Sequence, residues 1–186
     1  MHLEFAKMNG LGNDFVFIED LDGTLDLTPE AVQWFCDRHF GIGADGLILV
    51  RPAISPDAHF YMHYFNADGS LAEMCGNGAR CFAKYVVDHA LVPADATTLT
   101  IETLGGLKPV TFTRAHDGTL DLATVDMGIP ALAPADIPTT FEGTHVYDCP
   151  VDTPEGEIRI TAVSMGNPHV VTWVDDVEVA PVDTIG

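Results

Sequence analysis

The sequence predicts a mixed fold of strands and helices, in which strands predominate. Short segments rich in Val, Ile, Phe and Thr recur along the chain and have the pattern of half-buried strands. Two segments have the apolar spacing of a helix, one beginning after Thr28 and one over residues 77–90. From residue 97 onward, strand signals recur without a convincing helix. The helices are therefore expected in the first half of the chain.

The first half is expected to begin with strands at residues 2–8 and 14–20. A helix follows, because Thr28 is a suitable N-cap, Pro29 fits the first helical position and Gly41 suits the end of the helix. This helix would place four side chains on one face, those of Val32, Phe35, Cys36 and His39.

Two more strands are predicted at residues 46–52 and 59–65, and the second leads into the polar turn "NADGS", residues 66–70. The helix at 77–90 has a broad apolar surface, so strands are expected to enclose it on several sides. The later strand signals lie at residues 97–103, 108–114, 118–127, 144–151, 157–165 and 169–176.

The Pro- and Ala-rich segment 128–143 is expected to be an irregular loop between strands. A turn signal at "AHDG", residues 115–118, follows the last of the mixed strand and helix signals. It indicates a domain boundary, which divides the chain into residues 1–116 and 117–186.

Composition excludes several classes of function. Eight Lys and Arg against 28 Asp and Glu give a formal charge of −20, which would repel nucleic acids and anionic membranes. No apolar run approaches the roughly 18 residues of a membrane span, and the first residues do not resemble a secretory signal. We therefore expect a cytoplasmic protein that binds neither nucleic acid nor membrane.

The four cysteines form no Cys-x-x-Cys pair and no dense framework, so neither a disulfide scaffold nor a zinc site is expected. Cys36, Cys81 and Cys149 are interpreted as structural, with Cys36 in the core. The chain has no phosphate-binding loop or dinucleotide motif, and none of its three lysines stands in a Schiff-base context. If the protein has an active site, that site is therefore expected to work without a metal or cofactor.

The segment "MCGNGARC", residues 74–81, is the exception, because its first cysteine has the surroundings of a reactive thiol. Cys75 stands where a turn enters a helix, so unpaired backbone N–H groups and the helix dipole would stabilise a thiolate there. Gly76 and Gly78 allow a ligand to approach closely, and the same N–H groups can bind its carboxylate. The asparagines of the chain all lie in such Gly-rich clusters, which suits recognition of an amino acid: Asn9, Asn13, Asn66, Asn77 and Asn167.

The run "NADGSLAEMCGNGAR", residues 66–80, closely resembles the signature of diaminopimelate epimerases. Further segments resemble that family in the same order: "FAKMNGLGNDF", "DRHFGIGADG", "VDMGIP" and "VSMGNPH". The resemblance therefore covers the whole chain. It implies two similar α+β domains, each with strands wrapped around a central helix, and a ligand in the cleft between them.

The activity that the resemblance implies is the cofactor-independent interconversion of LL- and meso-diaminopimelate, for lysine and cell-wall synthesis. Inversion requires that one proton leave one face of the α-carbon and another arrive on the opposite face. Two opposed cysteines, one thiolate and one thiol, can do this. The resemblance identifies Cys75 as one of them, and it also implies a homodimer.

Site residues follow from the same resemblance, position by position. His169 matches a position expected to tune the cysteines. Gly46 stands where some members have a substrate-contacting Gln, so that contact is expected to be absent. The matches to substrate-binding positions are Asn13, Asn66, Gly76, Asn77 and Asn167.

A larger departure concerns the second half of the site. The resemblance implies a second Cys-Gly motif and a Glu-Arg pair in the second domain, and nothing after residue 167 matches them. The other three cysteines lack a Gly-rich context at the start of a helix. The second domain, residues 117–186, is therefore expected to be incomplete, and the 186-residue chain to be inactive by itself.

Three other functions stay open at this point. A related amino-acid racemase, such as a proline racemase, is disfavoured by Asn77, because those enzymes usually have His there. A non-catalytic binding or assembly module would agree with the missing second cysteine. A cysteine hydrolase has less support, because no histidine can be assigned as the base for Cys75.

Overall fold

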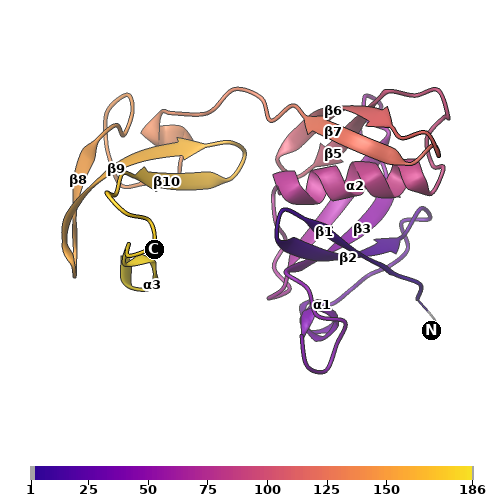
Figure 1. Cartoon of the computed structure of the whole chain (residues 1–186), viewed down its shortest axis with the longest axis horizontal. Helices are drawn as coiled ribbons and strands as arrows, with labels where there is room; N and C mark the ends of the chain where they lie inside the picture. The colour runs from indigo at the N-terminus through magenta and orange to yellow at the C-terminus, as the bar shows by residue number, and fades with distance from the viewer. Residues whose placement is uncertain (1–2, 186) are drawn as a thin grey trace. The chain divides into compact units, whose positions relative to one another are not determined.

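The computed structural model describes residues 3–185, which divide after Met127 into a first and a second unit (Figure 1). The described strands of the first unit form one seven-stranded sheet whose spatial order follows the sequence. Its pairs are antiparallel except β2 with β3 and β4 with β5, which are parallel. The strands are β1 (Ala6–Gly10), β2 (Asn13–Glu19), β3 (Gly46–Pro52), β4 (Phe60–Asn66), β5 (Thr98–Thr103), β6 (Gly106–Arg114) and β7 (Leu120–Val125).

Helices α1 (Pro29–Cys36) and α2 (Gly76–Asp88) make the two parallel crossovers, after β2 and after β4. Alternate side chains of β2 and β3 point toward the two helices. Both strands are therefore buried on both faces, which is why their sequences are continuous apolar runs. Toward α2 they place Phe15, Phe17, Ile48 and Val50. Toward α1 they place Val16, Ile18, Leu47 and Leu49.

Helix α2 lies at the centre of the first unit. Figure 1 shows β5, β6 and β7 on one side of α2 and β1, β2 and β3 on the other. Phe82, Ala83 and Val86 are fully buried in this core. The predicted helix at 77–90 and its enclosure are confirmed, although it ends at Asp88 and Ala90 lies beyond it with a φ of 55°.

Helix α1 ends earlier than predicted. Thr28 is its N-cap, as expected, but the helix stops at Cys36 instead of continuing toward Gly41. The Asp37 carboxylate accepts hydrogen bonds from the backbone N–H groups of His39 and Phe40, both at 2.7 Å, and such a side-chain turn competes with the helix. His39 is therefore exposed and not on a helical face, whereas Cys36 is in the core as predicted.

The first strand also differs from its expected position at residues 2–8. It covers Ala6–Gly10, because its register with β2 is set by a hairpin turn at Leu11 and Gly12, both with positive φ. His2 lies outside the described residues. The strands predicted at 14–20, 46–52, 59–65, 97–103 and 108–114 are confirmed to within two residues at each end.

The "AHDG" segment, expected to mark a boundary, is a hairpin turn inside the first sheet. Ala115 accepts from the Gly118 N–H and donates to the Thr119 carbonyl, so β6 continues directly into β7. The first unit consequently extends to Met127, and β7 belongs to it. A turn signal alone cannot distinguish a hairpin from a linker, because both need the same local backbone.

The second unit contains a three-stranded antiparallel sheet with β9 at its centre. Segment 128–143 is largely irregular, as predicted, and includes the short helix η1 (Pro134–Asp136). A small core of Ile137, Val146, Ile160 and Ala162 packs against one face. The remaining elements are β8 (Cys149–Thr153), β9 (Gly156–Ser164), β10 (Pro168–Thr172) and α3 (Val182–Ile185).

Candidate active site

Cys75 is the N-cap of α2. Its backbone is extended, with φ −139° and ψ 116°, and its Sγ accepts the Gly78 N–H at 3.4 Å. The side chain is half-buried against the core cluster around α2. Unpaired N–H groups of the first turn and the positive end of the helix dipole both favour negative charge at this sulfur. The local geometry expected from "MCGNGARC" is therefore present.

The other thiols have different surroundings. Cys36 and Cys81 are buried, and burial raises the pKa of Cys36 to about 11 and raises that of Cys81 as well. Cys149 lies in β8 of the second unit, half-buried, with its Sγ donating to the Tyr147 carbonyl at 3.6 Å. All four cysteines are free. Within the first unit, Cys75 is thus the thiol that a ligand can approach.

Asn13 and Asn77 meet directly beside Cys75. The Asn77 amide in the first turn of α2 donates to Asn13 Oδ1 at 2.8 Å, and the Arg80 guanidinium donates to Asn77 Oδ1. Glycine at position 10 permits this contact, since a Cβ there would lie 2.9 Å from Cys81 Sγ and 3.1 Å from the Asn77 carbonyl oxygen. The hairpin of β1 and β2 can therefore lie against the start of α2.

A group of charged side chains connects Asn13 to Arg38, which lies just after the end of α1. Asn13 Nδ2 donates to Asp45 Oδ2 at 3.1 Å, and Arg38 donates to Asp45 Oδ1 at 2.7 Å. Arg38 also donates to both carboxylate oxygens of Asp14, at 2.8 and 3.0 Å, while Lys7 lies 3.0 Å from Asp14. The Arg38 hydrogen bond is the main cause that lowers the pKa of Asp14 well below its usual range.

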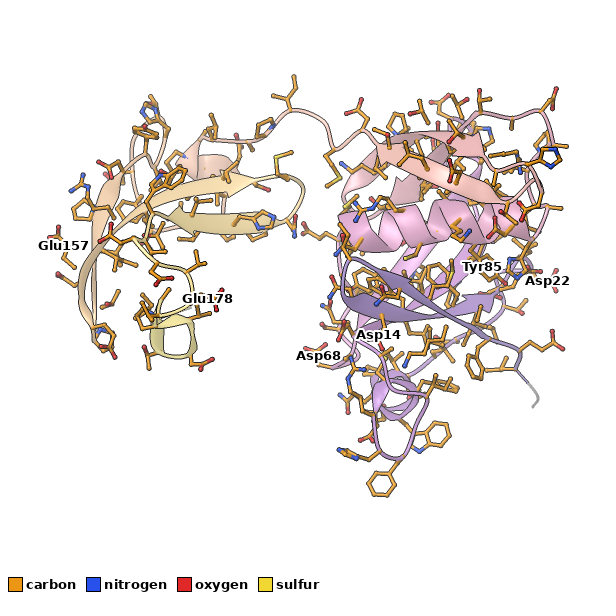
Figure 2. All side chains as sticks on the ribbon, viewed as in Figure 1. Asp14, Asp22, Asp68, Tyr85, Glu157 and Glu178 are labelled. Atoms are coloured by element: carbon orange, nitrogen blue, oxygen red, sulfur yellow. The ribbon has the colours of Figure 1, made fainter. Side chains whose placement is uncertain are left out.

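Asn66 lies at the end of β4, in the "NADGS" turn. Its side chain donates to Ser70 Oγ at 3.0 Å, and Asp68 Oδ1 accepts the Ser70 N–H at 2.8 Å. The next residue, Ala67, donates its N–H to the Asp45 carbonyl at 3.1 Å, which holds the turn beside the Asn13 group. Figure 2 shows Asp14 and Asp68 toward one end of the first unit, and Tyr85 and Asp22 toward the other.

Gly76 is the first residue of α2, and its nearest side chain is that of Met127. A Cβ on Gly76 would lie 3.7 Å from Met127 Sδ. The Met127 carbonyl accepts from the buried Lys108 ammonium at 3.4 Å. The last residue of the first unit is therefore fixed against the start of α2, a contact that the sequence analysis did not anticipate.

Gly46 has no room for a longer side chain. A Cβ there would lie 2.6 Å from the Phe65 carbonyl oxygen and 2.6 Å from Tyr64 Cε2. Burial raises the pKa of Tyr64 to about 12, so its phenol stays neutral at pH 7. The Tyr64 ring thus occupies the space next to Gly46, so a longer side chain, such as the Gln that the resemblance implies for some family members, would not fit there.

Asn167 and His169 belong to the second unit, at the turn between β9 and β10. His169 Nε2 lies 3.0 Å from Asn167 Oδ1, and the imidazole is exposed. This hydrogen bond joins two residues of the second unit. The role expected for His169 toward the cysteines therefore stays a prediction, as do the roles of the other site residues.

Comparison with known proteins identifies the family. The diaminopimelate epimerase family model matches residues 5–133. The chain is 46% identical over 186 residues to diaminopimelate epimerase of Aromatoleum aromaticum, and 42% identical over 184 residues to that of Acetivibrio thermocellus. The alignments cover 100% and 99% of the chain. The chain belongs to the diaminopimelate epimerase family.

This membership confirms the resemblance carried by the "NADGSLAEMCGNGAR" run. The chain spans 64% of the length of both diaminopimelate epimerases named above. Two solved structures share its fold. They are a hydroxyproline epimerase from Agrobacterium vitis, with a TM-score of 0.72, and a probable proline racemase from Agrobacterium radiobacter, with 0.71.

These structures are only 16% and 18% identical to the chain, and they match 97% and 96% of it against 55% and 54% of their own lengths. They confirm the α+β fold of the diaminopimelate epimerase type, with strands wrapped around a central helix. Among residues 3–185, no group of three or more His, Cys, Asp or Glu side chains is arranged to hold a metal ion. No described helix is long and apolar enough to cross a membrane.

Sequence reasoning did not assign two residues that the structure places in the site. Asp45 lies in the quoted cluster "GIGADG", and Arg80 ends the motif that begins at Cys75. Both contact an asparagine of the candidate site through a side-chain hydrogen bond. Their proximity to Gly-rich clusters was the available signal, but their partners depend on contacts between distant segments.

Proposed function

We propose that this chain acts in the cofactor-independent epimerisation of LL-diaminopimelate to meso-diaminopimelate, with Cys75 as one of two acid/base residues. The main support is the position of Cys75 as the half-buried N-cap of α2 in a chain of the diaminopimelate epimerase family. The names of relatives that are 42% and 46% identical support the substrate.

The chemistry requires two groups on opposite faces of the α-carbon. As a thiolate, Cys75 accepts the α-proton; as a thiol, it donates a proton to the planar intermediate. A second cysteine on the opposite face performs the complementary step. Buried Cys36 and Cys81 cannot serve, because neither is accessible to a ligand and burial raises the pKa of both thiols.

The start of α2 can also stabilise the charge that develops during proton removal. The negative charge spreads from the α-carbon onto the α-carboxylate. We assign its stabilisation to the backbone N–H groups of Gly76 and Asn77, which belong to the first turn of α2. Substrate binding is assigned to the same turn and to the asparagines around it, which are Asn13, Asn66, Asn77 and Asn167, with His169 tuning the cysteines.

Exchange of the α-proton with deuterated water tests this function. In the full-length protein, diaminopimelate should incorporate deuterium, and Cys75→Ser should slow the exchange by at least about 100-fold, because it removes an acid/base group. Cys149→Ser, which changes a half-buried thiol in the second unit, is the matched control and should keep normal exchange. Normal turnover by a folded Cys75→Ser protein would contradict the proposal.

A substrate panel separates the remaining functions. Inversion of diaminopimelate but not of proline is expected, and the reverse preference would favour an amino-acid racemase of the proline type. Binding of diaminopimelate without proton exchange would favour a non-catalytic binding module. The proposal also includes a homodimer in the cytoplasm, and sedimentation velocity of the full-length protein tests its assembly.

A further inference from the structure

The polar side chains from Asp45 to Arg80 form a chain of hydrogen bonds with a fixed direction. Asp45 Oδ2 accepts from Asn13 Nδ2 at 3.1 Å, and Asn13 Oδ1 accepts from Asn77 Nδ2 at 2.8 Å. Asn77 Oδ1 in turn accepts from the Arg80 guanidinium. A carboxylate offers only acceptors and a guanidinium only donors. The two ends of the chain therefore determine which way both amides between them point.

This direction decides what the two amides can offer to a ligand. Each amide oxygen already accepts a hydrogen bond from a protein donor. Each amide nitrogen has a second N–H, and no residue in the described part of the chain is recorded as its acceptor. Both side chains are half-buried, so these N–H groups remain accessible and can donate to an acceptor that the ligand brings. Asn13 and Asn77 therefore suit a carboxylate better than an ammonium group.

Asp45 is itself held in place from three sides. Its Oδ1 accepts from Arg38 at 2.7 Å, and its Oδ2 also accepts the Asp14 N–H at 3.1 Å. Its backbone carbonyl accepts the Ala67 N–H at 3.1 Å. Both carboxylate oxygens are thus engaged by donors of the protein, and the one that faces Asn13 has a defined position.

We propose that Asp45 is a positioning residue, which acts through Asn13 to hold the free N–H groups of Asn13 and Asn77 toward a carboxylate of the substrate. The inference rests on the proposed function and deepens it, because it names the charged group of diaminopimelate that this part of the site binds. Asp45 does not touch the substrate. Its contribution is the direction that it gives to the two amides.

A purely structural role for Asp45 would depend on its ion pair with Arg38, and two conservative variants separate the roles. Asp45→Asn keeps one oxygen, which can face Asn13 and the Asp14 N–H, but it places an amide nitrogen against Arg38. Arg38 retains both of its hydrogen bonds to Asp14. Asp45→Glu keeps the charge for Arg38 but displaces the acceptor from Asn13 by one methylene group.

Two probes test which group the amides bind, without requiring turnover. Pimelate is the carbon skeleton of diaminopimelate with its two carboxylates and no amino groups, whereas 1,5-diaminopentane has the two amino groups and no carboxylates. Calorimetry and competition against diaminopimelate would be measured on the full-length protein for wild type, Asp45→Asn and Asp45→Glu. Asp117→Glu is the control, since Asp117 accepts similar bonds in the β6–β7 turn.

The expected result is that Asp45→Glu weakens pimelate binding about tenfold, the effect of one displaced hydrogen bond to a charged group. Asp45→Asn should stay near the wild-type affinity, and 1,5-diaminopentane binding should be the same in all proteins. Weaker pimelate binding by Asp45→Asn, with normal binding by Asp45→Glu, would overturn the proposal in favour of the ion pair. Equal losses for both probes would also overturn it.

The experiments distinguish a failure of the positioning role of Asp45 from a failure of the catalytic role of Cys75. Proton exchange by Cys75→Ser would refute the acid/base role of Cys75, but it would leave the pimelate comparison unchanged. In contrast, normal exchange in the wild type together with the reversed order of the two Asp45 variants would refute the positioning role alone. Melting temperatures of the variants establish that each compared protein is folded.

Discussion

The first unit holds Asn13 and Asn77 against a large core, whereas the second unit holds Asn167 and His169 at the end of a hairpin. The core around α2 includes side chains from α2 and from every strand of the first sheet. The core of the second unit has four buried residues, and Trp173, which follows β10, is 92% exposed. The candidate residues of the first unit are therefore held by contacts between distant segments, whereas those of the second unit are held by a local turn.

The two units are expected to differ most in the free energy of unfolding that is lost when a core side chain is removed. Phe82→Ala should lower the free energy of unfolding of the first unit by about 3–5 kcal/mol, because the ring is fully buried between Phe17 and Phe60. Ile160→Ala in the second unit should cost about 2 kcal/mol, the low end for such a change. Urea unfolding with hydrogen exchange resolved for each unit measures both, and equal losses would contradict the comparison.

A smaller effect is expected from the crowded glycine of the first sheet. Gly46→Ala should cost about 3 kcal/mol, because the new Cβ would meet the Phe65 backbone oxygen at 2.6 Å and overpack the core. Gly156→Ala in the second unit has open space around it and a φ of +116°, so it should cost about 1 kcal/mol from backbone strain. Thermal unfolding followed by circular dichroism measures both losses of stability. A larger loss for Gly156→Ala than for Gly46→Ala would contradict the prediction.

The smallest change in stability is expected from the loss of an ion pair, and this change depends on pH. Hydrogen bonds from Arg38 lower the pKa of Asp14 from its ordinary value of 3.8. Ionised Asp14 therefore stabilises the folded state above that value, and the contribution is lost as the pH falls through the lower pKa of the folded protein. Asp14→Asn should destabilise the protein at pH 7, and the difference from wild type should shrink as the pH falls below 3.8.

The second unit provides the control for this measurement. Asp148 and Arg159 form a pair whose side chains are 56% and 53% exposed, and exposed pairs contribute at most about 1 kcal/mol. The Asp14 side chain is only 16% exposed. At pH 7, Asp148→Asn should therefore lower the free energy of unfolding less than Asp14→Asn does. Urea titrations of both variants at neutral and acidic pH provide the comparison, and a pH-independent effect of Asp14→Asn would contradict it.

Local signals in the sequence predicted the elements more reliably than their ends. The apolar spacing over 77–90 predicted α2, and the glycines after Cys75 predicted where it starts. The end of α1 was missed because the Asp37 carboxylate forms a turn with His39 and Phe40. The boundary near 115–118 was misplaced, because the turn between the two predicted strands is a hairpin that pairs β7 with β6, and a turn signal by itself fits a hairpin and a linker equally well.

The sequence by itself determined the family and the position of Cys75 at the start of a helix, because both depend on residues that are consecutive in the chain. Only the tertiary structure decided that Asn13 lies on Asn77 and that Tyr64 fills the space beside Gly46. It also decided that Asp45 accepts a hydrogen bond from Asn13 and that Arg80 donates one to Asn77. Those contacts join segments far apart in the chain, and they form only because burying the strands around α2 brings the segments together.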